Sequence, residues 1–130
     1  TPMEQGKNAK QVVEEAWFPG DHSCVGGGKV VKAPLSNRCL LWMLERINAH
    51  DICLATNLKA LNEEIDIDHT VAFDNTIRGL YRLTGSSLRS IKGNCDQLDI
   101  SVKRRWRDCP DYRPKNLSRR FRGKLDSWKE

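Results

Sequence analysis

The sequence predicts an all-α protein, a small bundle of about four to six helices. Apolar residues recur at helical spacing through several successive segments, so each segment can bury one face against the others. Prolines, glycines and short polar side chains separate these segments, as is typical where helices begin and end. At 130 residues, 38% of them hydrophobic, the chain has the size and composition of one domain with a modest core.

The apolar pattern divides the chain into three parts. Residues 1–34 contain an N-terminal helix, expected over residues 7–18, and a glycine-rich connector. Residues 35–109 form the helical bundle, and residues 110–130 form a basic tail that can become helical. The connector includes GGGK, but a phosphate-binding Walker loop needs Ser or Thr after that lysine, where Val30 stands. A flexible connector is therefore the favoured interpretation.

The first two helices of the bundle are leucine-rich. Ser36 is the expected N-cap of a helix that runs from about residue 37 to residue 49. Asp51 can cap the second helix, which ends near Glu64. Their apolar stripes consist of Leu40, Met43, Leu44 and Ile47 in the first helix, and Leu54, Leu58, Leu61 and Ile65 in the second. The two stripes need a common partner, because burial stabilises Leu and Ile side chains.

The last two helices of the bundle complete the predicted core. The third contains NTIRGLYRL and is closed by Gly85, since glycine is the usual residue just beyond a helix. The fourth follows Asp96 and Asp99, which resemble a capping box, and stops at Cys109. Its stripe at i, i+4 and i+8 consists of Leu98, Val102 and Trp106. We expect one shared interior that contains Leu44, Leu58, Leu80 and Trp106.

The tail carries both a helical stripe and most of the positive charge. Its stripe consists of Leu117, Phe121, Leu125 and Trp128. The net charge of the chain is +5, and residues 103–124 hold ten Lys or Arg against two Asp. Such a segment can dock on the bundle or become ordered on a partner, and aromatic residues among arginines also suit nucleic acid. The candidate nucleic-acid contacts are Arg113, Lys115, Arg119, Arg120, Arg122 and Lys124.

The sequence offers few groups for catalysis or metal binding. The five cysteines are an odd number and include no C-x-x-C pair, which favours reduced thiols in an intracellular, reducing compartment. The nearest approaches to a reactive cluster are the His22–Cys24 pair and the Asp66–Asp68–His69 segment. No apolar run is long enough to span a membrane. We therefore expect a non-catalytic chain without cofactor, metal or membrane association.

The segment TIRGLYRLTGSS, followed after a gap by ISVKRRWRDC, resembles the closing helices of the TFIIS N-terminal domain, the LW type. The residues NRC at positions 37–39 resemble the start of the second helix in the integrase-binding domain of lens-epithelium-derived growth factor, which belongs to this group. The resemblance spans about residues 35–109. It implies a five-helix scaffold of nuclear transcription and chromatin factors that binds short disordered peptides and catalyses nothing.

By that analogy, the partner-binding groove and its basic rim are formed by Trp42, Ile47, Arg78, Arg82, Arg104 and Arg105. A second hypothesis is a helix-turn-helix in residues 77–91, in which Ser86, Ser87 and Arg89 would face the bases of DNA. A defined duplex bound in a salt-dependent manner would distinguish this hypothesis from peptide binding.

Overall fold

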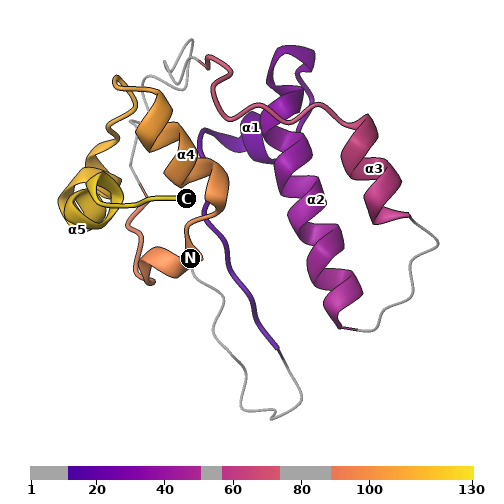
Figure 1. Ribbon diagram of the computed structural model, residues 1–130, viewed down its shortest axis with the longest axis horizontal. Helices are drawn as coiled ribbons and strands as arrows, with labels where there is room; N and C mark the ends of the chain where they lie inside the picture. Colours follow the sequence, from indigo (N-terminus) through magenta and orange to yellow (C-terminus); the bar gives the residue numbers. More distant parts are fainter. Residues whose placement is uncertain (1–11, 51–56, 74–88) are drawn as a thin grey trace, which may run out of the picture.

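A computed structural model describes residues 12–50, 57–73 and 89–130 (Figure 1). Within these ranges the chain is helical, with five α-helices and no β-strand, which confirms the predicted small all-α bundle. The elements are α1 (His22–Val25), the 3-10 helix η1 (Val30–Lys32), α2 (Ala33–Ala49), α3 (Leu58–Glu64), the 3-10 helix η3 (Cys95–Gln97), α4 (Ile100–Asp108) and α5 (Lys115–Asp126). None of the helices in these ranges has the length and apolar content to cross a membrane.

Helix α2 is the longest element and begins earlier than the sequence predicted. Pro34 lies in its first turn. Backbone N–H groups there have no acceptor within the helix, so the missing N–H of proline costs no hydrogen bond. Ser36 is therefore inside the helix rather than its cap, and its hydroxyl donates to the carbonyl of Ala33 at 3.1 Å. The helix ends at Ala49 as expected, and the N–H of His50 closes its last turn.

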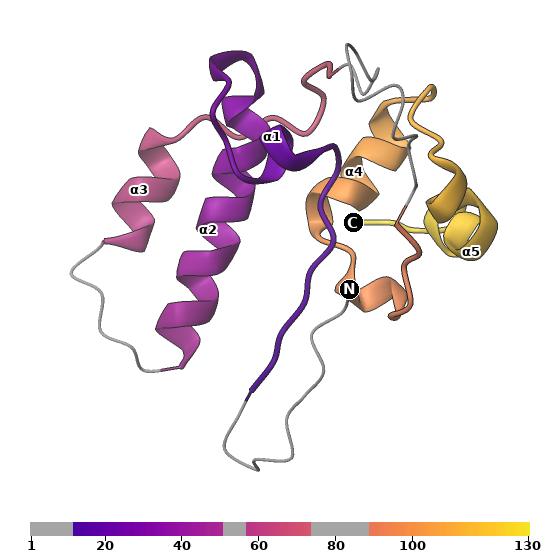
Figure 2. The same cartoon turned by 180° about the vertical axis from the view of Figure 1, so that it is seen from behind.

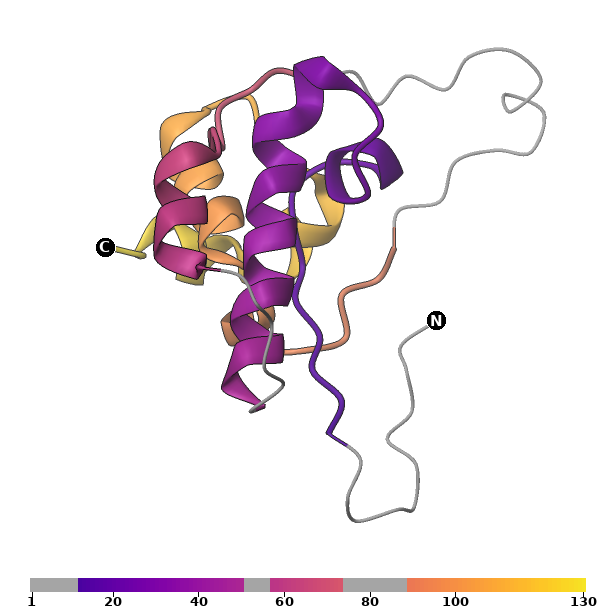
Figure 3. The same ribbon diagram turned by 90° about the vertical axis from the view of Figure 1, so that its right-hand side faces the viewer.

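Helix α3 is short and lies beside α2 (Figure 3). Its N-cap is Asn57, whose side-chain oxygen accepts hydrogen bonds from the N–H groups of Lys59 and Ala60, each at 3.1 Å. The predicted cap, Asp51, lies outside the described residues, as does the predicted third helix. The described end of the helix-turn-helix segment, residues 89–91, is not helical.

Helix α4 confirms the predicted fourth helix, but its cap differs in detail. Asp99 alone caps it, accepting from the N–H of Ser101 at 2.9 Å. The capping box is one turn earlier, where Asn94 and Gln97 satisfy each other's backbone N–H groups. The Asp96–Asp99 pairing was therefore wrong, because Asp96 lies within η3.

Helix α5 confirms that the tail is helical and docks on the rest of the chain. Leu117, Phe121 and Leu125 are all buried against α4. The indole N–H of Trp106 donates to the side chain of Asp126 at 2.8 Å, which fixes α5 against α4. The apolar stripe of the tail is therefore a packing face.

The main apolar core of the described residues does not include the predicted α2 and α3 positions, so the prediction of one shared interior was wrong. The main core consists of Ile91, Leu98, Val102, Trp106, Leu117, Phe121 and Leu125. The other buried apolar residues are Cys24 in α1 and Leu35, Cys39 and Leu41 in α2. Leu44 and Leu58 are only half-buried, because α2 packs against α1 and α3 instead of α4, and Leu80 lies outside the described ranges.

The described elements form two halves, one with α1, α2 and α3 and the other with η3, α4 and α5 (Figure 1). An extended segment, residues 12–20, runs between these two halves. Its residues up to 18 were predicted to belong to a helix over residues 7–18, but Trp17 forms an isolated parallel bridge with Leu98. The N–H of Trp17 donates to the carbonyl of Gln97 at 2.8 Å, and its carbonyl accepts from Asp99 at 3.0 Å. These backbone bonds and the packing of the indole on the main core replace helix formation.

Candidate functional site

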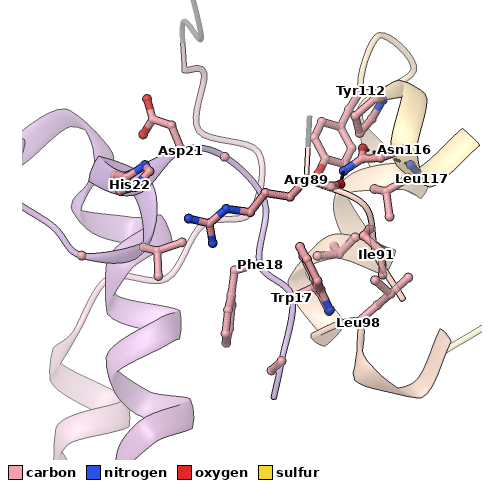
Figure 4. A pocket seen from close by; sticks show the side chains of 16 residues that line it. Trp17, Phe18, Asp21, His22, Arg89, Ile91, Leu98, Tyr112, Asn116 and Leu117 are labelled. Atoms are coloured by element: carbon pink, nitrogen blue, oxygen red, sulfur yellow. Dashed lines mark hydrogen bonds between the residues drawn. The ribbon is translucent and has the colours of Figure 1, made fainter. Parts of the chain in front are cut away.

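A pocket of about 730 Å³ opens between the two halves (Figure 4). One wall comes from residues 16–26, and the other comes from residues 89–117. Trp17, Ile91 and Leu98 supply apolar surface from the edge of the main core. The pocket is large enough for a small molecule with an apolar part.

The imidazole of His22 and the guanidinium of Arg89 both belong to residues that line this pocket. Figure 4 shows the guanidinium of Arg89 extending across the pocket toward α1, which carries His22. The side-chain nitrogen of Asn116 donates to the carbonyl of Arg89 at 3.0 Å, which fixes the backbone from which the Arg89 side chain extends. Neither His22 nor Arg89 has a side-chain partner among the described residues.

His22 is held in place because α1 is tightly capped. The carboxylate of Asp21 accepts from the N–H groups of Ser23 at 2.9 Å and Cys24 at 3.1 Å. Gly20 precedes this cap with φ of 104°, and a Cβ there would overlap the side chain of Cys24. The local sequence therefore fixes the backbone from which the imidazole projects.

A buried lysine, Lys32, bonds the N-cap and the first turn of α1. Lys32 is 5% exposed, and its ammonium donates to Asp21 at 2.8 Å and to the hydroxyl of Ser23 at 2.9 Å. Burial opposes ionisation of Asp21, but the hydrogen bonds from Lys32, Ser23 and Cys24 together outweigh burial and hold the pKa of that carboxyl well below its usual range. The same hydrogen bond raises the pKa of Lys32. A lysine that stays protonated cannot act as a base toward Ser23.

The thiols near the pocket are unsuited to nucleophilic attack. Cys24 is fully buried, and burial raises the pKa of its thiol. Burial likewise raises the pKa of Cys39 to about 12. The His22–Cys24 pair is therefore not an activated thiol, and among the described cysteines Cys24, Cys39, Cys95 and Cys109 are all free.

The Asp66–Asp68–His69 segment has a structural role in the described part of the chain. Asp68 accepts hydrogen bonds from the N–H and hydroxyl of Thr70, both at 2.7 Å. The imidazole of His69 pairs with Asp108 at 2.7 Å. No metal-binding group of three or more candidate ligands occurs in residues 12–50, 57–73 and 89–130.

The described members of the predicted partner-binding set make separate contacts. Arg105 is 7% exposed, donates to the carbonyls of His69 and Val71, and stacks over Phe73 at 4.4 Å. Trp42 packs edge-on against Phe18, and Ile47 is half-buried on α2. Arg104 is paired with Glu130 at the C-terminus. Arg78 and Arg82 lie outside the described residues.

The basic residues of the tail are divided between structural bonds and solvent. Arg113 donates to three backbone carbonyls, and Arg120 donates to the carbonyls of Ile91 and Lys92. Arg122 lies 3.7 Å from Asp126. Lys115, Arg119 and Lys124 are exposed on α5. A nucleic-acid role for this set stays a prediction.

A family model described as the type VI secretion system (T6SS) phospholipase effector Tle1-like catalytic domain matches residues 1–46. The match covers 46 of the 130 residues, so the similarity concerns the N-terminal third of the chain. No curated protein and no solved structure was found to match the chain.

The family match overturns the functional predictions made from helical stripes. A catalytic domain of a bacterial secretion effector is neither a TFIIS-type scaffold nor a nuclear transcription or chromatin factor. It also contradicts the expectation of a non-catalytic chain and the helix-turn-helix alternative. The resemblance failed because leucines, arginines and a tryptophan at helical spacing occur in many unrelated bundles.

The sequence interpretation missed the segment that forms the pocket wall. Trp17, Phe18, Gly20 and His22 were assigned to a helix end and a flexible connector, whereas they line the pocket. A signal was present, because two aromatic residues, glycines and a histidine lie within WFPGDHSCVGGG, and such loops often carry function. Asn116 and Ile91 could not be linked to them, since only the tertiary fold brings residues so distant in sequence together.

Proposed function

We propose that this chain forms the substrate pocket of a Tle1-like phospholipase and takes part in the hydrolysis of phospholipids. The observation that carries the proposal is that the family match and the pocket lining share the same segment of the chain. The segment matched by the phospholipase family, residues 1–46, supplies half of the residues that line the pocket, from Ala16 to Gly26.

The chemistry of the pocket suits a phospholipid. An acyl chain needs an apolar surface, which Trp17, Ile91 and Leu98 provide. The phosphate of the headgroup needs a cation or hydrogen-bond donors, and Arg89 offers a planar guanidinium at the same pocket. An amphiphile with an anionic head can therefore satisfy both sides of the pocket together.

His22 is the residue that we assign to proton transfer. Imidazole is the side chain most often used as a general acid or base, and this one projects from a rigidly capped turn at the pocket. The hydroxyl of Ser23 is occupied by Asp21 and Lys32, and the thiol of Cys24 is buried. Neither Ser23 nor Cys24 is therefore a candidate for proton transfer. His22 would take a proton from the water that attacks the ester carbonyl and give it to the alcohol oxygen as the acyl C–O bond breaks, which releases the fatty acid and the alcohol.

Release of fatty acid from a monomeric short-chain phosphatidylglycerol by the full chain tests this proposal. We expect His22→Ala to lower the rate at least about a hundredfold, because general acid–base catalysis contributes roughly 10²- to 10⁴-fold. His50→Ala is the matched control, since His50 follows α2 and pairs with Glu14 at 3.1 Å, apart from the pocket. Absence of release by the unmodified chain, or equal rates for both variants, would contradict the proposal.

A further inference from the structure

The loop that joins α1 to α2 exposes a cluster of apolar side chains. Val25, Val30 and Val31 are 44%, 91% and 73% exposed, and Lys29 lies among them in sequence and is exposed as well. We call these four residues the valine tip. It lies at the upper end of the molecule in Figure 2, where α2 begins. Single exposed valines are common in proteins, but several in one short loop need an explanation.

The backbone of the tip is held in a defined shape. Gly27 and Gly28 have φ of 79° and 92°, which L side chains rarely adopt, so the turn depends on glycine. On the other side, Lys32 is buried and bonded to Asp21 and Ser23, which fixes the end of η1, the 3-10 turn that contains Val30 and Val31. The glycine turn on one side and the bonded Lys32 on the other therefore hold Val30 and Val31 in exposed positions.

The charge around the tip is positive. No Asp or Glu occurs in the sequence between Asp21 and Glu45, whereas Lys29 lies in the tip itself. Apolar side chains beside a lysine are the combination that binds the interface of a phospholipid bilayer, where the valines enter the headgroup boundary and the ammonium stays among the phosphates. The chain as a whole has a net charge of +5, which adds long-range attraction to anionic lipid.

The tip is continuous with the pocket. Val25 belongs to the tip and also lines the pocket, as does its neighbour Gly26. A bilayer in contact with the tip would therefore lie beside the pocket from which His22 and Arg89 can reach a lipid. We infer that the valine tip inserts into the surface of a phospholipid bilayer and delivers lipid to the pocket, an inference whose second half rests on the proposed function.

Co-sedimentation with vesicles tests the insertion. The full chain is mixed with vesicles of phosphatidylcholine and phosphatidylglycerol at 3:1, and with vesicles of phosphatidylcholine alone. We expect the double variant Val30→Asp, Val31→Asp to bind either vesicle at least about tenfold more weakly, since burying one Val contributes about 1.5 kcal/mol or more and 1.4 kcal/mol is tenfold. Lys29→Gln should weaken binding about fivefold on the anionic vesicles only.

The matched control is Leu40→Asp with Met43→Asp, which places the same charges on apolar side chains of α2 that are 46% and 55% exposed. This control should bind like the unmodified chain. The milder variant Val30→Ser, Val31→Ser, with an unchanged melting curve, covers the case in which the aspartates prevent folding. Failure of the unmodified chain to bind vesicles, or equal losses in the tip and control variants, would overturn the inference.

Two further measurements separate the possible outcomes. Hydrolysis of the monomeric lipid by the tip variants should match that of the unmodified chain, because Val30 and Val31 do not line the pocket. Vesicle binding that needs the tip, in a chain without hydrolytic activity, would support insertion and contradict only the proposed function. A dimer in lipid-free solution that the tip variants lose would assign the tip to a second copy of the chain and overturn insertion.

Discussion

At the scale of single residues, the site depends on groups that support others. Asp21 lines the pocket, and its carboxylate caps α1, holds Lys32 and so determines where His22 lies. Its carboxylate accepts hydrogen bonds from four donor groups, which belong to Ser23, Cys24 and Lys32. Such a group contributes through its ionised form, because only the carboxylate can accept all of these hydrogen bonds.

This role predicts a pH dependence of stability. Because the pKa of Asp21 is lowered in the folded chain, its contribution is complete above the ordinary carboxyl value and is lost as the pH falls through the depressed value. Asp21→Asn should therefore lower the melting temperature clearly at neutral pH, and the difference from the unmodified chain should shrink below about pH 4. Thermal melts at several pH values measure this.

The exposed Asp111 supplies the control for that series. Asp111→Asn should melt like the unmodified chain across the range, because its carboxylate makes no side-chain contact in the described parts of the chain. A gap between Asp21→Asn and the unmodified chain that stays constant from neutral to acid pH would show that Asp21 does not act through its charge.

At the scale of elements, the two halves are joined more by polar contacts than by helix packing. Helix α2 packs on α1 and α3, and α4 packs on α5. One such contact is made by the guanidinium of Arg38, which lies 2.7 Å from the carboxylate of Asp99. Asp99 is 7% exposed and also caps α4, so one ion pair links the long helix to the start of the core helix.

Removal of this ion pair should be costly. Arg38→Ala leaves the buried carboxylate of Asp99 without its cation, and breaking a buried pair in this way destabilises proteins by about 3 to 5 kcal/mol. Arg46→Ala is the matched control, because Arg46 is half-exposed and lies 3.7 Å from Glu14. That substitution should change the free energy of unfolding by less than about 1 kcal/mol. Urea unfolding of both variants measures the two values, and equal values would refute the linking role of Arg38.

The elements that the sequence could predict are those specified by local spacing. The stripes around Trp106 and Phe121 correctly placed α4 and α5, because i, i+4 periodicity reports a buried helix face wherever its partner lies. The same rule failed for Trp17, whose extended backbone is set by hydrogen bonds to Gln97 and Asp99. Those partners are about 80 residues away in the sequence, so no local pattern could indicate them.

At the scale of the whole molecule, the pocket exists only because the halves meet. Its two walls come from opposite ends of the chain, and Arg89 approaches α1 from the far side. The apolar stripes predicted one interior shared by both halves, and a single interior leaves no pocket between them. Sequence patterns describe which faces are buried, whereas the pairing of faces is decided by packing that the sequence does not display.

The central claim is that a phospholipid binds between His22 and Arg89, and its most direct measurement is an NMR titration of ¹⁵N-labelled full chain with monomeric short-chain phosphatidylglycerol. We predict saturable shifts at the indole of Trp17 and around Arg89, with affinity reduced about tenfold or more in Arg89→Gln, because a hydrogen bond to a charged group contributes roughly 1.5 to 3 kcal/mol. Shifts confined to the exposed face of α5, or unchanged affinity in Arg89→Gln, would contradict the account.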